Sequence, residues 1–170
     1  MPVAPPARLL LLLLMMFSLS DATAQTARAT VWPGGGAMFT IHVGPAYLYL
    51  TRDGTIRTIG ASSPGYVRYE KGLLIQAGQV YFSYSTGGRL QRIGDLYLSY
   101  DSYGRLNAVG NRSINYYENR VAYLLDQEVR YNINGSLRSF GDAYVSYNYE
   151  GTVVQEISDR AGLITLQYDF

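Results

Sequence analysis

The chain of 170 residues carries 14 Lys and Arg against 13 Asp and Glu, and it contains no Cys. Its arginines are scattered along a nearly neutral chain, which argues against a nucleic-acid-binding protein, because such a protein concentrates basic residues on one face. Without Cys there are no disulfides, so packing and strand pairing alone must hold the fold.

Residues 1–24 have the layout of a secretory signal peptide. Arg8 precedes an apolar run from Leu9 to Leu19, and Ala22-Thr23-Ala24 forms an Ala-x-Ala cleavage site before Gln25. The apolar run is shorter than the about 20 residues that a transmembrane helix needs. We therefore expect an exported protein, located in the periplasm, at the cell surface or outside the cell.

The mature chain begins with a segment that differs from the rest. The breaker cluster Trp32-Pro33-Gly34-Gly35-Gly36 predicts a flexible N-terminal segment over residues 25–36. Alternating apolar residues at Phe39, Ile41 and Val43 then predict a first strand, which Gly44-Pro45 ends. Residues 37–170 are expected to form a single β-repeat domain, in which the irregular stretch GASSPGYVRY, residues 60–69, is the candidate protruding loop.

A repeat of 15 or 16 residues occupies the chain from Tyr47 onward. Clear copies are YLSYDSYGRLNAVG at residues 97–110 and YLYLTRDGTIRTIG at residues 47–60. From Tyr69 onward, each unit has an anchor tyrosine that ends a short β-prone run. These tyrosines are expected to line up as a structural ladder across the sheet: Tyr69, Tyr84, Tyr100, Tyr116, Tyr131, Tyr147 and, in a last truncated copy, Tyr168.

Two turn signals divide each unit into two strands. A polar turn follows the anchor and ends in a glycine such as Gly104 or Gly135, which supplies positive φ. About five residues later comes Gly94-Asp95, Gly110-Asn111 or Gly141-Asp142, typical of a two-residue type II′ hairpin, with Asp126-Gln127 at the same place in a degenerate copy. The prediction is an all-β fold, an antiparallel meander of tandem β-hairpins. Three arginines should lie opposite the anchor tyrosines and stack on them: Arg89, Arg105 and Arg120.

A second architecture remains open from the sequence. If Gly94 and Gly110 lie inside strands, each unit becomes one strand of about eleven residues, and the domain becomes a small up-and-down β-barrel in the outer membrane. The aromatic C-terminus, with Tyr168 and Phe170 at alternate positions, fits that alternative. Arg92 and Arg112 count against it, because both would sit in the lipid-facing row near mid-strand.

The string Tyr100-Asp101-x-x-Gly104-Arg105-Leu106 resembles the YD repeat of the Rhs family. Tyr84-x-x-x-Gly88-Arg89-Leu90 and Tyr131-Asn132-x-x-Gly135-x-Leu137 resemble weaker copies of the same motif. The repeats here are about five residues shorter than usual YD repeats. The resemblance implies β-hairpin repeats in an exported or cell-surface protein, and it carries over neither the family's toxin nor its encapsulating shell.

The sequence offers no catalytic constellation. His42 is the only histidine, and no nucleophile or orienting acid lies near it in the sequence. Single acids such as Asp53 and Asp101 fall in turns, where capping the turn explains them. Phosphate-binding glycine motifs are absent from the sequence. We therefore expect neither an enzyme nor a metal or other cofactor.

A second row of tyrosines, Tyr81, Tyr97 and Tyr144, falls on the opposite face of its strands by parity. Both rows can be structural, because aromatic residues favour strands and pair across them. Alternatively, an exposed face of aromatic residues and arginines would bind a glycan or a protein. The expected function is an exported structural or binding module of the cell envelope, with an envelope protein or a polysaccharide as its partner. A carbohydrate-binding repeat protein and an outer-membrane barrel are the alternatives, and only the barrel involves a membrane.

Overall fold

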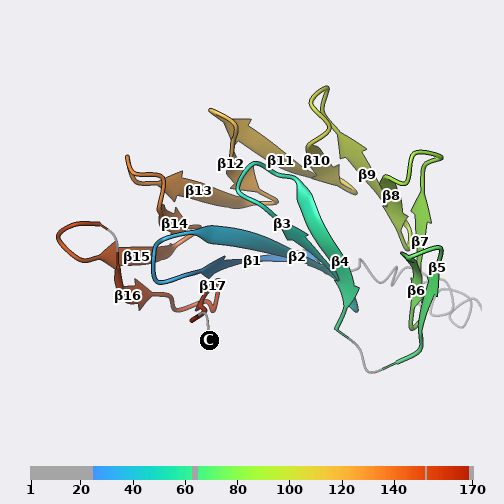
Figure 1. The fold of residues 1–170 in the computed structure, drawn as a ribbon, viewed down its shortest axis with the longest axis horizontal. Helices are drawn as coiled ribbons and strands as arrows, with labels where there is room; N and C mark the ends of the chain where they lie inside the picture. Colours follow the sequence, from blue (N-terminus) through green and yellow to red (C-terminus); the bar gives the residue numbers. More distant parts are fainter. Residues whose placement is uncertain (1–24, 63–64, 152, 169–170) are drawn as a thin grey trace, which may run out of the picture.

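The computed structural model describes residues 25–62, 65–151 and 153–168, and the signal peptide expected at residues 1–24 lies outside them. These residues form 17 β-strands and no helix, so no helix here is long and apolar enough to cross a membrane. The strands make two sheets, as Figure 1 shows. Every described strand pair is antiparallel except β1 with β17.

The smaller sheet has five strands in the order β17-β1-β2-β3-β4. Their bounds are β1 Gln25–Val31, β2 Ala37–Val43, β3 Ala46–Leu50, β4 Ile56–Ala61 and β17 Ile164–Leu166. One face of this sheet is apolar because the alternate residues of β2 and β3, such as Phe39, Ile41 and Leu48, point the same way and are fully buried.

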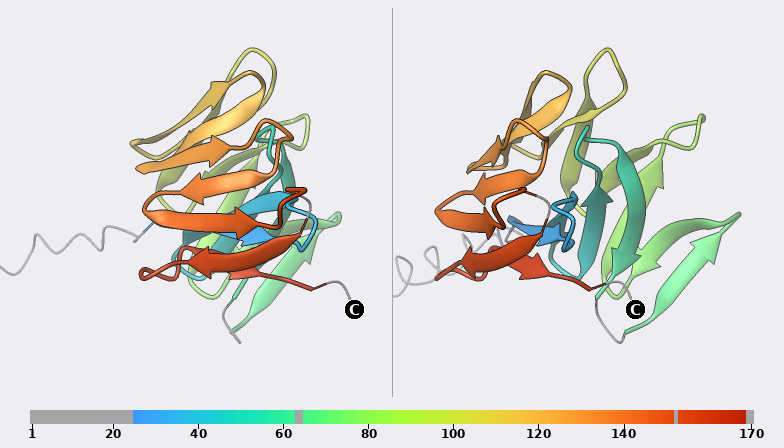
Figure 2. Two further views of the ribbon diagram at one scale, coloured as in Figure 1. Left: turned by 90° about the vertical axis from the view of Figure 1, so that its left-hand side faces the viewer. Right: turned by 60° about the vertical axis from the view of Figure 1, so that its left-hand side comes forward.

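The larger sheet is a meander of twelve strands in consecutive order from β5 to β16. Their bounds are β5 Val67–Glu70, β6 Leu73–Ala77, β7 Val80–Tyr84, β8 Leu90–Ile93, β9 Leu96–Tyr100, β10 Leu106–Val109, β11 Arg112–Tyr117, β12 Arg120–Leu124, β13 Gln127–Tyr131, β14 Leu137–Phe140, β15 Ala143–Tyr147 and β16 Val154–Ser158. Two strands make one repeat, and we name the second of each pair the return strand. Figure 2 shows this sheet bending as an arc around the smaller one.

The core lies between the concave side of the arc and the smaller sheet. In each repeat after the first of the arc, it takes the residue two before the anchor tyrosine and two residues of the return strand that lie three positions apart, such as Leu90 and Ile93. Phe39 of the smaller sheet meets Phe140 of the arc, with ring centroids 5.8 Å apart. Since the same positions recur every 15 or 16 residues, the repeat produces a continuous apolar inner surface.

Two turns of the smaller sheet insert into the concave side of the arc. They are the β1–β2 turn around Gly35 and the β3–β4 turn around Gly54. Four carbonyls of these turns accept a hydrogen bond from the N–H that begins the return strand in four successive repeats: Gly54 from Leu106 (3.3 Å), Arg52 from Val121 (2.8 Å), Gly35 from Leu137 (3.3 Å) and Pro33 from Val154 (2.9 Å). The return strands of the larger sheet are thereby joined, repeat by repeat, to the smaller one.

Several details differ from the sequence-based expectations. Residues 25–31, expected to be flexible, form β1, with Ala29 and Val31 fully buried between its neighbours. The unit at residues 47–60 forms β3 and β4 of the smaller sheet, so the repeats do not make one meander. Of the expected loop at residues 60–69, positions 60–61 belong to β4 and 67–69 to β5, and positions 63–64 lie outside the described residues.

The two-strand form of the repeat is the one observed. Gly94 and Gly110 have φ of 55° and 60° and lie in turns, so the eleven-residue strands of the barrel alternative do not form in the described residues. In the degenerate copy the turn is Leu125-Asp126, one residue earlier than expected, and Leu125 takes the glycine position with φ of 56°.

Candidate functional site

Tyr81 and Tyr97 lie on the outer, convex face of the arc, on β7 and β9. Both side chains are more than half exposed, because the strand alternation that buries Phe82 and Leu98 turns the tyrosines outward. Tyr66, just before β5, is exposed at the equivalent place, three residues before its anchor. We call Tyr66, Tyr81 and Tyr97 the outer tyrosine row. Its members lie two strands apart, a spacing of about 10 Å.

Polar side chains fill the spaces between the rings of the row. Gln76 is the cross-strand partner of Tyr81, and Arg92 is the partner of Tyr97. The Arg92 guanidinium lies 5.8 Å from the centroid of the Tyr97 ring, within cation-π range. The row therefore offers flat aromatic faces with hydrogen-bond donors and acceptors beside them.

Tyr144 does not join the outer tyrosine row. The equivalent positions between Tyr97 and Tyr144 are Ser113 and Glu128, so the row is interrupted there. Tyr144 instead lies near an ion pair between Arg130 and Glu128 with a 2.8 Å N–O distance. Of the three tyrosines predicted as a binding face, the structure brings together two. It adds Tyr66, which the spacing of three residues before Tyr69 could have identified.

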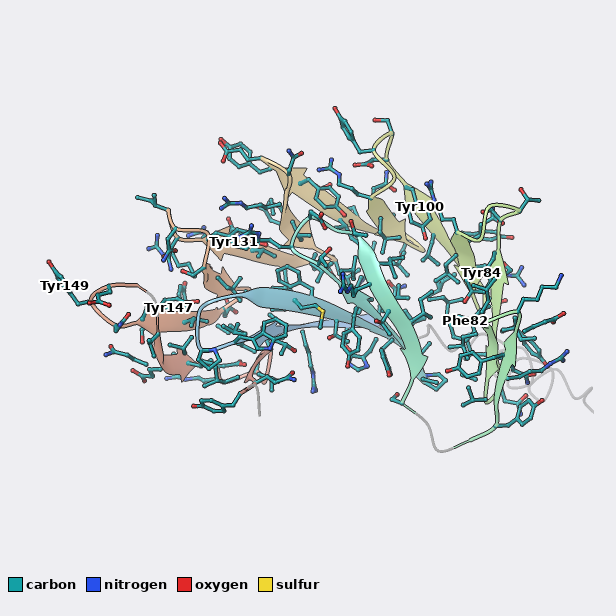
Figure 3. The ribbon with its side chains drawn as sticks, viewed as in Figure 1. Phe82, Tyr84, Tyr100, Tyr131, Tyr147 and Tyr149 are labelled. Atoms are coloured by element: carbon teal, nitrogen blue, oxygen red, sulfur yellow. The ribbon has the colours of Figure 1, made fainter. Side chains whose placement is uncertain are left out.

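The anchor tyrosines lie on the inner side of the sheet and hold successive repeats together. Figure 3 shows Tyr147, Tyr131, Tyr100 and Tyr84 following one another along the arc. Four anchor hydroxyls each donate to the backbone carbonyl ten residues earlier, at the start of the preceding return strand: Tyr84 to Leu74 (2.8 Å), Tyr100 to Leu90 (2.6 Å), Tyr116 to Leu106, and Tyr147 to Leu137 (2.5 Å). Because the bonds link neighbouring repeats, this ladder is structural.

Arginine side chains cover three of the anchor rings. Arg89 lies over Tyr100 at 4.9 Å, Arg105 over Tyr116 at 4.1 Å and Arg120 over Tyr131 at 5.7 Å, as the repeat pattern predicts. Burial raises the pKa of the Tyr100 hydroxyl to about 12, although the Arg89 charge opposes the shift. These phenols are therefore neutral donors at physiological pH.

Three anchors depart from the ladder. The Tyr131 hydroxyl is buried and has no hydrogen-bond partner, so the series of bonds is broken at that repeat. Tyr69 lies in β5 at the end of the sheet and is 61% exposed. Tyr168, expected to continue the ladder, follows β17, which belongs to the smaller sheet.

The predicted turn glycines all have positive φ. The values are 55° at Gly94, 81° at Gly104, 60° at Gly110, 85° at Gly135 and 56° at Gly141. At Gly94, Gly110 and Gly141 the next residue, Asp or Asn, has no positive φ, as a type II′ turn requires. The polar turns are closed by their first side chain; Asp101, for example, accepts hydrogen bonds from the backbone N–H groups of Tyr103 and Arg105.

The single histidine lies away from the arc. His42 is on β2, on the outer face of the smaller sheet, 6.3 Å from the ring of Tyr47, which in turn lies 4.9 Å from Tyr49. Burial, and then the nearby charge of Arg28, lower the pKa of His42. Within the described ranges no cluster of His, Cys, Asp or Glu is arranged to hold a metal ion.

A depression of about 520 Å³ lies near the tips of the hairpins that carry Glu118 and Ile133. Its lining includes three arginines, Arg120, Arg130 and Arg138, and one acid, Glu118. This lining presents positive charge without a histidine or a pair of carboxylates. Comparison of the chain with protein-family models, curated proteins and solved structures found no match.

Proposed function

We propose that this protein is an exported, non-catalytic binding module that holds a polysaccharide of the cell envelope on its outer tyrosine row. The observation that carries the proposal is the regular row itself: Tyr66, Tyr81 and Tyr97 are exposed to similar extents, at one strand position in successive repeats. Aromatic residues favour strands, and they are also enriched where surfaces bind partners.

The chemistry of the row favours sugars. Tyrosine presents an apolar ring face and a hydroxyl, which suits the C–H face and the hydroxyl groups of a pyranose ring. Arg92 and Gln76 supply hydrogen-bonding groups beside the rings. Tyr81 and Tyr97 lie on regular strands, so little conformational freedom is lost there on binding.

The periodic spacing favours a polymer. A chain with a regular repeat can contact several tyrosines at once, and each further contact is then an intramolecular event with a high effective concentration. Weak single contacts then add up to useful affinity. The secretory pattern of residues 1–24 and the resemblance to YD repeats both support a place outside the cytoplasm.

Co-sedimentation of the mature chain with purified peptidoglycan sacculi and with an insoluble β-glucan tests the proposal. Tyr81→Ala, at the centre of the row, should weaken binding about tenfold, because a central aromatic contact contributes at least about 1 kcal/mol. Tyr149→Ala is the matched control, since this fully exposed tyrosine projects from the β15–β16 turn, away from the row (Figure 3). Absence of binding to every polysaccharide, or equal losses in the two variants, contradicts the proposal.

A further inference from the structure

The larger sheet has two free edges, one at each end of the arc. No described strand pairs with the outer side of β5 or of β16, and Figure 1 places these strands at opposite ends of the molecule. In repeat proteins the terminal units usually carry polar caps that replace the missing neighbour. Neither end of this arc has such a cap among the described residues.

At the β5 end, residues that the repeat normally buries are exposed. The residue two before the anchor is at most 8% exposed in the five following repeats, for example at Phe82 and Leu98, but Val67 is 38% exposed. The anchor itself, Tyr69, has no earlier repeat to cover it. The β5 edge therefore lacks a return strand on its outer side.

At the β16 end the missing element is the opposite one. The two core positions of the return strand, three residues apart, are at most 3% exposed in five repeats, for example at Leu90 and Ile93. Their counterparts in β16, Val154 and Ile157, are only partly buried. The β16 edge therefore lacks the anchor strand of a following repeat.

The two ends of the arc are also complementary in the hydrogen bonds of the tyrosine ladder. Four anchor hydroxyls use the carbonyl of the first or second residue of the preceding return strand, and Tyr69 has no preceding return strand in this sheet. Val154 begins the last return strand, and no anchor strand follows it in the sheet. One end therefore presents the donor of the series and the other end presents the acceptor.

We propose that copies of this chain associate head to tail, with β16 of one copy pairing antiparallel with β5 of the next. The partner at each edge is a second copy of this chain, because each edge lacks the strand that the other edge supplies. Across the junction the repeat continues, and β16 pairs with β5 in the register in which β8 pairs with β9. In that register Arg92 faces Tyr97. Glu156 of one copy then faces Tyr66 of the next, and the Tyr69 hydroxyl reaches the Val154 carbonyl.

Charge supports this register. The diagonal neighbour of Glu156 across the junction is Arg68, and diagonal pairs on one sheet face are within reach of long side chains. Both side chains are exposed in the single copy. Such an interface is heterologous, so repeated addition builds a ring or a filament.

Sedimentation velocity over a range of concentrations tests the association. Val67→Pro blocks the β5 edge. The Tyr66 carbonyl accepts a hydrogen bond from Gly78, just after β6, so the next N–H, that of Val67, faces outward. Its loss therefore spares the pairing of β5 with β6. Ile157→Pro blocks the β16 edge, because Ile157 takes the place of Ile93, which pairs with Leu96 of the following strand. The wild-type chain should associate, and each variant alone should be monomeric.

Mixing the two blocked variants is the decisive step. Head-to-tail pairing predicts a complex of twice the monomer mass that grows no further, because the Val67→Pro copy offers only β16 and the Ile157→Pro copy offers only β5. If Ile157→Pro associates by itself, the interface is β5 with β5 and the proposal fails. A wild-type chain that stays monomeric at every concentration also overturns it.

A charge exchange separates loss of pairing from loss of folding. Arg68→Glu and Glu156→Arg should each raise the dissociation constant about tenfold, and the double variant should recover wild-type association. Circular dichroism of each variant checks that it is folded. If the double variant instead associates more weakly than either single variant, because the two losses of affinity add, Arg68 and Glu156 do not pair across the junction.

Discussion

The joint between the two sheets can be tested by comparing two glycines in equivalent turns. Gly54 and Gly88 each close a polar turn, with φ of 82° and 78°, and each N–H donates to the carbonyl three residues earlier at 2.9 Å. Replacing either with Ala therefore costs the same left-handed backbone strain, about 1 kcal/mol. The difference between the two variants then reports only what surrounds the added Cβ.

The surroundings differ completely. A Cβ at Gly88 meets nothing within 4 Å, whereas a Cβ at Gly54 overlaps the hydroxyl and the ring of Tyr116. Tyr116 would have to move, which loosens its hydrogen bond to the Leu106 carbonyl and its contact with Arg105. Overpacking of a core site costs about 1 to 3 kcal/mol, and the lost hydrogen bond costs about 1 more. We expect Gly54→Ala to destabilise by about 2 to 4 kcal/mol more than Gly88→Ala.

Urea unfolding followed by tyrosine fluorescence measures this difference, with far-ultraviolet circular dichroism as a second probe. Because 1 kcal/mol shifts the melting temperature of a domain of this size by about 2 to 4 °C, the two variants should also be well separated on heating. Equal losses in the two variants would refute the insertion of the β3–β4 turn into the arc.

Three further outcomes follow from the ladder and the turns. Tyr100→Phe should lower the free energy of unfolding by about 1 to 2 kcal/mol in urea titrations, while Tyr131→Phe should be neutral or stabilising because its buried hydroxyl has no partner. The pKa of Tyr100 is raised from 10.0 to about 12 in the folded chain, so the unfolded chain loses this proton at a lower pH. The stability of the fold should therefore decrease as the pH rises from about 10 to 12, and it should decrease less steeply in Tyr100→Phe. Gly110→Val should lower the free energy of unfolding by more than about 1 kcal/mol in thermal melts, because φ is 60° at Gly110 and the new Cβ would lie 2.9 Å from Leu96. Gly87→Val is the control and should be tolerated. A tolerated Gly110→Val would contradict the turn assignment.

The all-β class and the two strands of each repeat could be predicted from the sequence, because their causes are local. Glycine at Gly94 and Gly110 marks positive φ, and alternation along each strand places Phe82 inward and Tyr81 outward. The same alternation separates the ladder from the outer tyrosine row. Stacking of Arg105 on Tyr116 also follows from the repeat, since the two residues occupy fixed positions in neighbouring units.

The division into two sheets could not be predicted, because it depends on contacts between distant residues. The unit at residues 47–60 shares the turns of its neighbours, with Leu50 in place of the anchor tyrosine, and its pairing with β2 assigns it to the smaller sheet. The segment at residues 25–31 carries small residues such as Ala27 and Ala29, whose apolar signal is weak; they are buried because strands pack on both sides. The interruption between Tyr97 and Tyr144, by contrast, can be read from the repeat, because Ser113 and Glu128 stand three residues before their anchors.

The parallel pairing of β17 with β1 constrains the order in which the chain can fold. Ala29 pairs with Ile164, so the first described strand reaches its final neighbours only when the last described strand is in place. The hairpins of the arc, by contrast, are closed by residues adjacent in sequence and can form at once. The three residues of β17 should therefore be the last to gain protection from hydrogen exchange during refolding. Until they do, the smaller sheet has an open edge at β1.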